Sequence, residues 1–188
     1  MSYSLEQLFD LYRQAFPANE RRDESDLLHA LATPAYSVLT KDHHGELIAF
    51  AILFVPPGKT FALLEYLAVH PGKRRQGIGR ELVKAAIDQT PGRHLLTEVE
   101  SESNGPIALR RQQFYARCGF RRIEALNYQL PLPGNPPPMQ LLVYPRSAAL
   151  IDRTELALWI TTIYTEVYRC SSADPRIGQM LATVAPAI

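Results

Sequence analysis

LLEYLAVHPGKRRQGIGR, residues 63–80, is the stretch that decides the fold of this chain. A short apolar run ends in a polar turn, and Gly77 and Gly79 then open an amphipathic segment with helical spacing. This order predicts a strand, a glycine loop and the N-terminus of a helix. Backbone N–H groups and the helix dipole converge at such a turn, which indicates an anion-binding site.

Residues that are missing from the loop narrow the choice of anion. A nucleotide-binding P-loop would need Gly-Lys-Ser/Thr, and a dinucleotide fingerprint would need a third glycine where this chain has Leu82. The remaining pattern, RRQGIG at residues 74–79, resembles the R/Q-x-x-G-x-G/A pyrophosphate loop of the GNAT superfamily of acyl-CoA-dependent N-acyltransferases. The resemblance assigns binding of acetyl-CoA to this loop and to the strand end before it: Leu67, Ala68, Val69, Arg74, Arg75, Gln76, Gly77, Ile78, Gly79 and Arg80.

The strand before the loop also matches the family pattern. Residues 64–69 resemble the GNAT strand that diverges from its neighbour and leaves backbone groups available. The resemblance implies that the backbone of Leu67 and Val69 pairs with the pantetheine amides, as an added strand would. It also implies that the Val69 N–H polarises the thioester carbonyl.

A second block, residues 110–120, strengthens the resemblance. Its Y-x-x-x-G-F spacing resembles the GNAT segment whose tyrosine lies beside the CoA sulfur, and here that tyrosine is Tyr115. Carried over, Tyr115 protonates the departing thiolate or holds it by a hydrogen bond; the alternative is a core tyrosine on an amphipathic helix. One departure is Ala108, which stands where many GNAT proteins have an asparagine.

An amine acceptor arrives protonated near neutral pH, so a base must remove its proton before attack. Glu98 and Glu100 lie two apart on an expected strand, on one face and roughly 7 Å apart. Glu65, on a neighbouring strand, and His70 are further candidates. For each of them the alternative is a solvated or salt-bridged side chain, for instance one paired with Arg110 or Arg111. We expect Glu65 and Glu98 to be the catalytic candidates, and Glu100 and Glu20 to bind the acceptor.

Composition is compatible with this interpretation. The chain has 188 residues, 46% of them hydrophobic and 21% charged, and a formal net charge of +1, which argues against a broad nucleic-acid surface. Two cysteines make no disulfide framework, and no apolar run approaches the roughly 20 residues that span a bilayer. The N-terminus lacks the pattern of a secretory signal. We expect a cytoplasmic protein that binds neither nucleic acid nor membrane and needs no metal.

The periodicity of the rest of the chain suits the same fold. Helices are expected at 4–16, 23–31, 79–90, 107–117 and 152–169, and strands at 36–40, 46–55, 60–69, 94–100, 123–130 and 139–144. No periodicity is evident from Ser171 onward. The expected fold is α/β (α+β): a GNAT-like, mixed, twisted sheet of six to seven strands flanked by helices. Residues 1–146 would form the acyltransferase core, and residues 147–188 a C-terminal helical extension that packs on the core or at a dimer interface.

The sequence therefore predicts transfer of an acetyl group from acetyl-CoA to a primary amine, by direct attack in a ternary complex. The acceptor would be a small molecule or a protein amine, and the enzyme a monomer or homodimer. Two alternatives remain open. One is a non-catalytic acyl-CoA-binding or regulatory module on the same fold, and the other is an interaction protein that works through its C-terminal helix.

Overall fold

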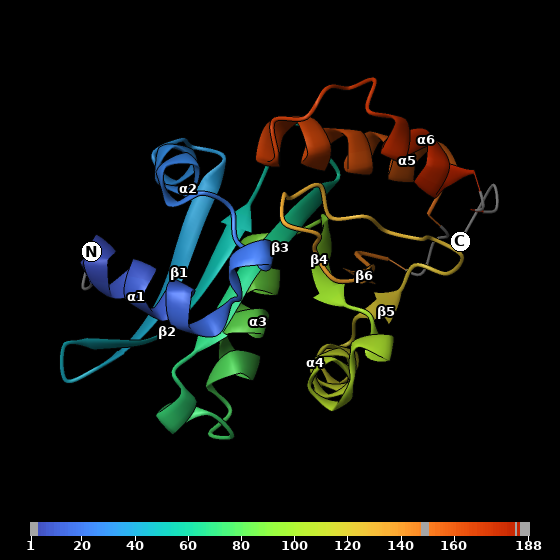
Figure 1. Cartoon of the computed structure of the whole chain (residues 1–188). Coiled ribbons are helices and arrows are strands. Elements are labelled where there is room, and N and C mark those ends of the chain that lie inside the picture. Colours follow the sequence, from blue (N-terminus) through green and yellow to red (C-terminus); the bar gives the residue numbers. More distant parts are fainter. Residues whose placement is uncertain (1–3, 148–150, 183, 185–188) are drawn as a thin grey trace. The chain divides into compact units, whose positions relative to one another are not determined.

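The computed structural model describes residues 4–147, 151–182 and 184. The chain divides into two compact units, Met1–Leu95 and Leu96–Ile188 (Figure 1). The first unit contains α1 (Leu5–Ala15), η1 (Ala18–Glu20), α2 (Glu24–Leu31), β1 (Tyr36–His43), β2 (Glu46–Phe54), β3 (Phe61–Val69), η2 (Pro71–Lys73) and α3 (Ile78–Gln89). The second unit contains most of β4 (His94–Glu100), then η3 (Glu102–Asn104), α4 (Pro106–Arg117), β5 (Arg121–Arg122), β6 (Met139–Tyr144), α5 (Arg153–Thr162), the π-helix η4 (Ile163–Val167) and α6 (Pro175–Leu181).

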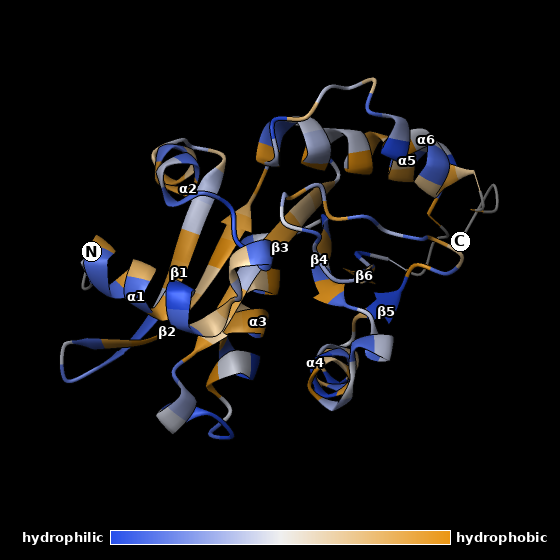
Figure 2. Cartoon of the chain, viewed as in Figure 1, coloured by the Kyte–Doolittle hydropathy of each residue, from blue (hydrophilic) through white to orange (hydrophobic). Residues whose placement is uncertain are grey.

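The first unit is built on an antiparallel meander, β1-β2-β3, in which Val38, Ile52 and Tyr66 lie in one cross-strand row. That face packs against the apolar side of α1, which a capping box at Ser4 starts. The alternate residues of β2 are also buried and point to the other side of the sheet, where α3 contacts β1, β2 and β3. Because both faces of β2 are covered, this strand is a continuous apolar run, as Figure 2 shows.

The second unit pairs its strands in the order β4-β6-β5. Gln140 and Leu142 lie on β6, and Leu142 faces Arg122 of the two-residue strand β5. With six strands and flanking helices, the described residues confirm the α/β class. The predicted extension begins at residue 147, and its residues 148–150 lie outside the described part of the chain.

One sequence prediction about this unit is wrong. The segment 123–130 is irregular and not a strand, although Ile123, Leu126 and Tyr128 are buried. Its apolar alternation reflects burial of side chains without a hydrogen-bonded ladder, which periodicity cannot distinguish. The tail, in which no periodicity is evident, contains the helix α6, which begins after Asp174, whose carboxylate accepts the backbone N–H of Arg176. The Asp-Pro start is the sequence signal for this helix.

The end of α4 depends on a glycine. Gly119 has a φ of +91°, and a Cβ placed there would lie 3.0 Å from Cε2 of Tyr144. We expect Gly119→Ala to lower the free energy of unfolding by about 2–3 kcal/mol, because it adds a steric contact to the cost of a left-handed non-glycine residue.

Gly45→Ala is the matched control for this substitution. Gly45 has a φ of +83°, but a Cβ added there would have no atom within 4 Å, so the expected loss is about 1 kcal/mol. Urea denaturation measures both variants. Equal losses would contradict the role given to the Tyr144 contact.

Candidate active site

The glycine loop lies in the first unit, between η2 and α3. Gly77 is the N-cap of α3 with a φ of +84°, and Arg75 before it also has a positive φ, of 64°. This backbone makes a tight turn out of the 3-10 helix and into α3. Residues 74–77 are exposed, and Lys73 before them is half-buried. Ile78 is buried and anchors the first turn of the helix in the core.

No side chain caps the N-terminus of α3. Its first intrahelical hydrogen bond runs from the Glu81 N–H to the Gly77 carbonyl, at 3.0 Å, so the N–H groups of residues 78–80 have no partner within the helix. Among the α-helices of the described residues, four have a side-chain N-cap: Ser4, Asp23, Asp152 and Asp174. The start of α3 thus leaves its donors available to an anion, and the helix dipole adds to the attraction.

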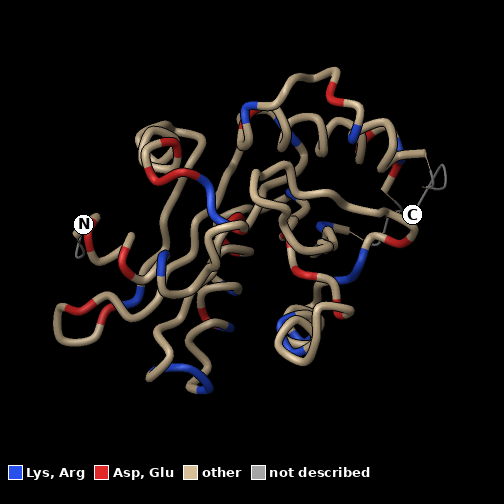
Figure 3. Tube along the Cα trace, in the orientation of Figure 1, with Lys and Arg blue, Asp and Glu red and all other residues tan. Residues whose placement is uncertain are grey.

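Positive side chains surround these donors. Lys73, Arg74, Arg75 and Arg80 all belong to the turn and the first helical turn, and Figure 3 shows the stretch between η2 and α3 in the colour of Lys and Arg. Glu81 is held by Lys41 at 3.1 Å. An exposed loop with this excess of positive charge suits a multiply charged group such as a pyrophosphate.

The loop is tied to the end of the strand before it. The Arg74 Nε donates to the Val69 carbonyl oxygen at 3.1 Å, so loop and strand end form one local structure. In the register of the meander, Leu67 lies opposite Ala51 and Val69 opposite Ala49. Leu67 and Val69 are half-buried, unlike the preceding residues of β3, and Ala68 between them is buried.

Glu65 lies deeper in the same strand, in an aromatic and charged cluster. Its Oε1 accepts a hydrogen bond from Arg22 Nη1 at 3.0 Å, and the side chains of Arg22 and Glu65 are 4% and 1% exposed. The same Nη1 donates to the Tyr36 hydroxyl at 3.0 Å. The Arg22 backbone is held as well, because its N–H donates to the Tyr66 hydroxyl and its carbonyl accepts from Tyr12.

Burial dominates the ionisation of this cluster. It raises the pKa of the Glu65 carboxyl above the ordinary value, and attraction to Arg22 offsets only part of that rise. The pKa of the Tyr36 phenol is raised as well, by burial first and by the Glu65 charge second. Glu65 is therefore a carboxylate with raised proton affinity, fixed by a buried arginine. Glu20, the other acidic candidate of this unit, is half-buried at the end of η1.

Tyr115 lies in the second unit, near the end of α4, and is 9% exposed. Its ring makes edge contacts with Phe114 and Phe120, with ring centroids 5.1 and 5.3 Å away. Burial raises the pKa of the Tyr115 phenol to about 12, while a hydrogen bond with Thr97 works in the opposite direction. The hydroxyl is therefore protonated at neutral pH and able to donate a proton or a hydrogen bond.

The two glutamates of β4 have different partners. Glu100 accepts from Arg111 Nη1 at 3.0 Å, and its backbone carbonyl accepts from the Gln112 side chain at 2.8 Å. Glu98 accepts hydrogen bonds from two tyrosine hydroxyls, Tyr128 and Tyr168. Glu100 is therefore paired with an arginine, which agrees with the salt-bridge alternative from the sequence. Glu98 is held by two phenol hydroxyls.

Sequence reasoning misses the partners of both candidate bases. Arg22 stands out only as part of the FP-x-x-E-R-R segment, residues 16–22, and neither Tyr128 nor Tyr168 belongs to a motif. Scattered aromatic residues around a long irregular segment are a weak signal. Only the tertiary structure brings residue 168 to residue 98.

Across the described ranges, no group of three or more His, Cys, Asp or Glu side chains could hold a metal ion. No helix in that part of the chain has the length and apolar character needed to cross a membrane. Cys118 and Cys170 are both free thiols.

The α/β fold and the glycine loop before an uncapped, arginine-flanked helix N-terminus agree with the class of the acyltransferases. The chain belongs to the acetyltransferase (GNAT) family, whose model matches residues 5–120. No curated protein sequence matches the chain.

Solved structures of the same family share this fold. A protein of Bacteroides thetaiotaomicron assigned to the GNAT acetyltransferases is 23% identical, with a TM-score of 0.73, over 88% of this chain and 92% of that one. The ribosomal-protein-S18-alanine N-acetyltransferase of Escherichia coli is 24% identical, with a TM-score of 0.60, over 77% and 89%. A GNAT acetyltransferase of Elizabethkingia anophelis with acetyl-CoA bound is 21% identical, with a TM-score of 0.52, over 72% and 88%.

Proposed function

We propose that the protein is an N-acetyltransferase that moves an acetyl group from acetyl-CoA to a primary amine. The amine nitrogen attacks the thioester carbonyl carbon directly, so that a C–N bond forms and the C–S bond breaks. The amine gives up a proton to a base, and the departing thiolate takes up a proton from an acid. On this proposal the acceptor is an amine of a small molecule or a protein, and the enzyme works in the cytoplasm as a monomer or homodimer.

The observation that carries the proposal is the uncapped N-terminus of α3. Its N–H groups, the positive φ of Gly77 and the side chains of Arg74, Arg75 and Arg80 suit the pyrophosphate of CoA. The half-buried strand end at Leu67 and Val69 suits the pantetheine arm. Membership of the GNAT family supports acyl transfer in general.

Tyr115 is the proposed acid, because the family pattern places this tyrosine beside the CoA sulfur and its hydroxyl is protonated at neutral pH. Glu98 and Glu65 are the proposed bases. Burial of Glu65 raises its proton affinity, and half-burial leaves Glu98 more accessible. Glu100 and Glu20 are the proposed contacts of the acceptor, and Arg111 lowers the net charge that Glu100 can offer to a cationic amine.

A thiol-release assay tests the proposal. The purified protein is mixed with acetyl-CoA and a panel of amines that includes polyamines, amino acids, aminoglycosides and peptides with free N-termini. Product is followed as free CoA and as a mass increase of the amine, because Cys118 and Cys170 would react with thiol reagents themselves. Release that depends on one class of amine is expected. Binding of acetyl-CoA without transfer to any amine would contradict catalysis and favour a non-catalytic module.

Tyr115→Phe separates the chemical step from donor binding. We expect kcat to fall about 100-fold, because the leaving thiolate loses its acid, with the dissociation constant of acetyl-CoA unchanged. Tyr144→Phe is the matched control, since Tyr144 is half-buried on β6 and its ring packs against Phe120. Unchanged turnover in Tyr115→Phe would make this tyrosine purely structural.

A further inference from the structure

The Glu98 carboxylate accepts hydrogen bonds from two segments that lie far apart in the sequence. Tyr128, in the irregular segment after β5, donates its hydroxyl hydrogen to Oε1 in a short hydrogen bond. Tyr168, directly after the π-helix η4, donates to Oε2 at 2.6 Å. Each carboxylate oxygen therefore has its own phenol, and a rotation of the carboxylate would weaken both hydrogen bonds.

A π-turn brings Tyr168 to this position. The Tyr168 N–H bonds to the carbonyl of Ile163, five residues back, at 3.2 Å, and the chain then leaves the helix. The extra residue in the turn rotates the direction of the side chains that follow, and such turns are frequent at functional sites. The preceding helix is firmly anchored, because Trp159, Ile163 and Tyr164 are fully buried.

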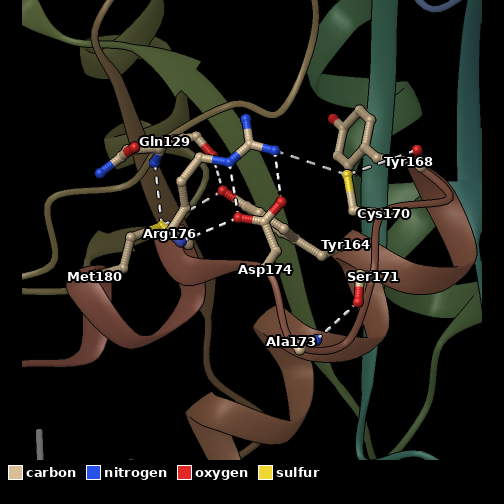
Figure 4. Close-up of polar contacts among 9 residues, drawn as sticks. All are labelled: Gln129, Tyr164, Tyr168, Cys170, Ser171, Ala173, Asp174, Arg176 and Met180. Carbon is tan, nitrogen blue, oxygen red and sulfur yellow. Dashed lines mark hydrogen bonds and ion pairs between the residues drawn. The ribbon is translucent and has the colours of Figure 1, made fainter.

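The rest of the C-terminal segment holds this turn in place (Figure 4). Arg176 pairs with Asp174 through Nη2 at 2.7 Å and Nε at 2.9 Å, and its guanidinium lies 5.5 Å from the centre of the Tyr164 ring. The Tyr164 hydroxyl donates to the carbonyl of Gln129 at 2.5 Å, and the Gln129 N–H donates to the Met180 sulfur. The residue after Tyr128 is thus bonded to the same segment that carries Tyr168.

We propose that Tyr128 and Tyr168 position the Glu98 carboxylate to take up the proton of the acceptor amine. The C-terminal segment, residues 153–181, is then part of the catalytic apparatus and not an appendage. This role rests on the proposed function, because it needs Glu98 to act as the base. Tyr128 and Tyr168 are positioning residues that act through Glu98.

The chemistry of the two phenols suits this role. A carboxylate oxygen has two lone-pair directions, so one oxygen can accept a hydrogen bond from a phenol and from an ammonium group or a water together. A hydroxyl can also accept a hydrogen bond. When Glu98 takes the proton from the amine nitrogen, one tyrosine can turn from donor to acceptor and keep the neutral acid in place. The freed nitrogen lone pair is then available to attack the thioester carbon.

Other titratable groups interact with the donor Tyr128 or with the Glu98 charge. Burial, and after it the Glu98 charge, raises the pKa of the Tyr128 phenol far above the ordinary value. Burial also raises the pKa of the Tyr164 phenol, to which Glu98 contributes, and that of the Cys170 thiol. Around neutral pH these groups are therefore uncharged, and Tyr128 remains a hydrogen-bond donor to the carboxylate. Removing a donor destabilises the charged form of the carboxylate and moves its titration to higher pH.

The test is a double-mutant cycle of Tyr168→Phe and Glu98→Gln, with kcat/KM measured from pH 5 to pH 9. We expect Tyr168→Phe to move the acid limb upward by about one pH unit, so that the rate falls by up to about tenfold at pH values below the wild-type limb and is unchanged on the plateau. In the Glu98→Gln background the same substitution should change the rate less than about twofold, because it acts through Glu98. Tyr144→Phe is the control: it removes a hydroxyl from a half-buried tyrosine on β6, outside the segment that carries Tyr168, and it should leave the acid limb unmoved.

The possible outcomes separate the two proposals. An active wild type in which Tyr168→Phe has the same effect in both backgrounds, or leaves the acid limb unmoved, overturns the positioning role alone. A wild type that binds acetyl-CoA but releases no CoA with any amine overturns the proposed function, and the positioning role with it. A cycle in which the Tyr168 effect disappears with Glu98 supports both.

Discussion

Replacing Arg22 by methionine should lower the free energy of unfolding by about 3–5 kcal/mol at pH 8, because it leaves a buried carboxylate without its cation. The Glu65 side chain is 1% exposed and Arg22 is its ion-pair partner, at 3.0 Å. Methionine fills much of the arginine volume, so the loss of stability should come more from the missing charge than from poorer packing. The hydrogen bond from Arg22 to Tyr36 disappears as well.

The loss should depend on pH in a defined direction. Burial already raises the pKa of Glu65 in the folded protein, and removal of Arg22 raises it further. Between the unfolded value of about 4.3 and the folded pKa, the folded state holds a proton that the unfolded state lacks, so stability falls as pH rises. The deficit of Arg22→Met should therefore be smaller near pH 5 than at pH 8.

Urea denaturation at the two pH values measures this difference. The control is the double variant Arg22→Met with Glu65→Leu, which removes both charges and should recover most of the stability. A deficit that is equal at pH 5 and pH 8, or a double variant no more stable than Arg22→Met, would contradict the importance of the ion pair.

Gly77→Val should weaken acetyl-CoA binding by about 100-fold, because a β-branched residue cannot keep a φ of +84° without strain of about 1–3 kcal/mol. The loop would escape that strain by moving the N–H groups at the start of α3 away from the pyrophosphate. Isothermal titration calorimetry with acetyl-CoA measures the effect directly.

Gly58→Val is the matched control for the loop variant. Gly58 has a φ of +68° in the turn between β2 and β3, with no atom within 4 Å of an added Cβ. It should lose a similar amount of stability and keep its affinity for acetyl-CoA. Equal affinity losses in the two variants would show that Gly77 acts only through the stability of the fold.

Local sequence patterns predicted much of the fold. The helices near residues 4–16 and 23–31 and the glycine loop before α3 follow from patterns within short stretches, and the structure has all three. The segment 123–130 could not be predicted in the same way. Its alternating apolar residues are buried by packing, and the hydrogen-bond partners that would make it a strand are not encoded locally.

In the candidate site, too, the features within short stretches could be predicted and the contacts between distant residues could not. The loop and Tyr115 stand out because their spacing is compact, within residues 74–79 and 115–120. The partners of Glu65 and Glu98 lie 43 and 70 residues away, at Arg22 and Tyr168. A single sequence carries no signal for contacts at such separations. The role of the C-terminal segment therefore emerges only from the structure.

Pyrophosphate binding by loop 74–79 is tested most directly by comparing acetyl-CoA with S-acetylpantetheine, which keeps the thioester arm and lacks the pyrophosphate and nucleotide. The wild type should bind acetyl-CoA at least about 100-fold more tightly, since two charge-assisted hydrogen bonds of about 1.5 kcal/mol each multiply to that factor. Gly77→Val should lose most of that preference. Equal affinity of the wild type for the two compounds would contradict pyrophosphate recognition by the loop.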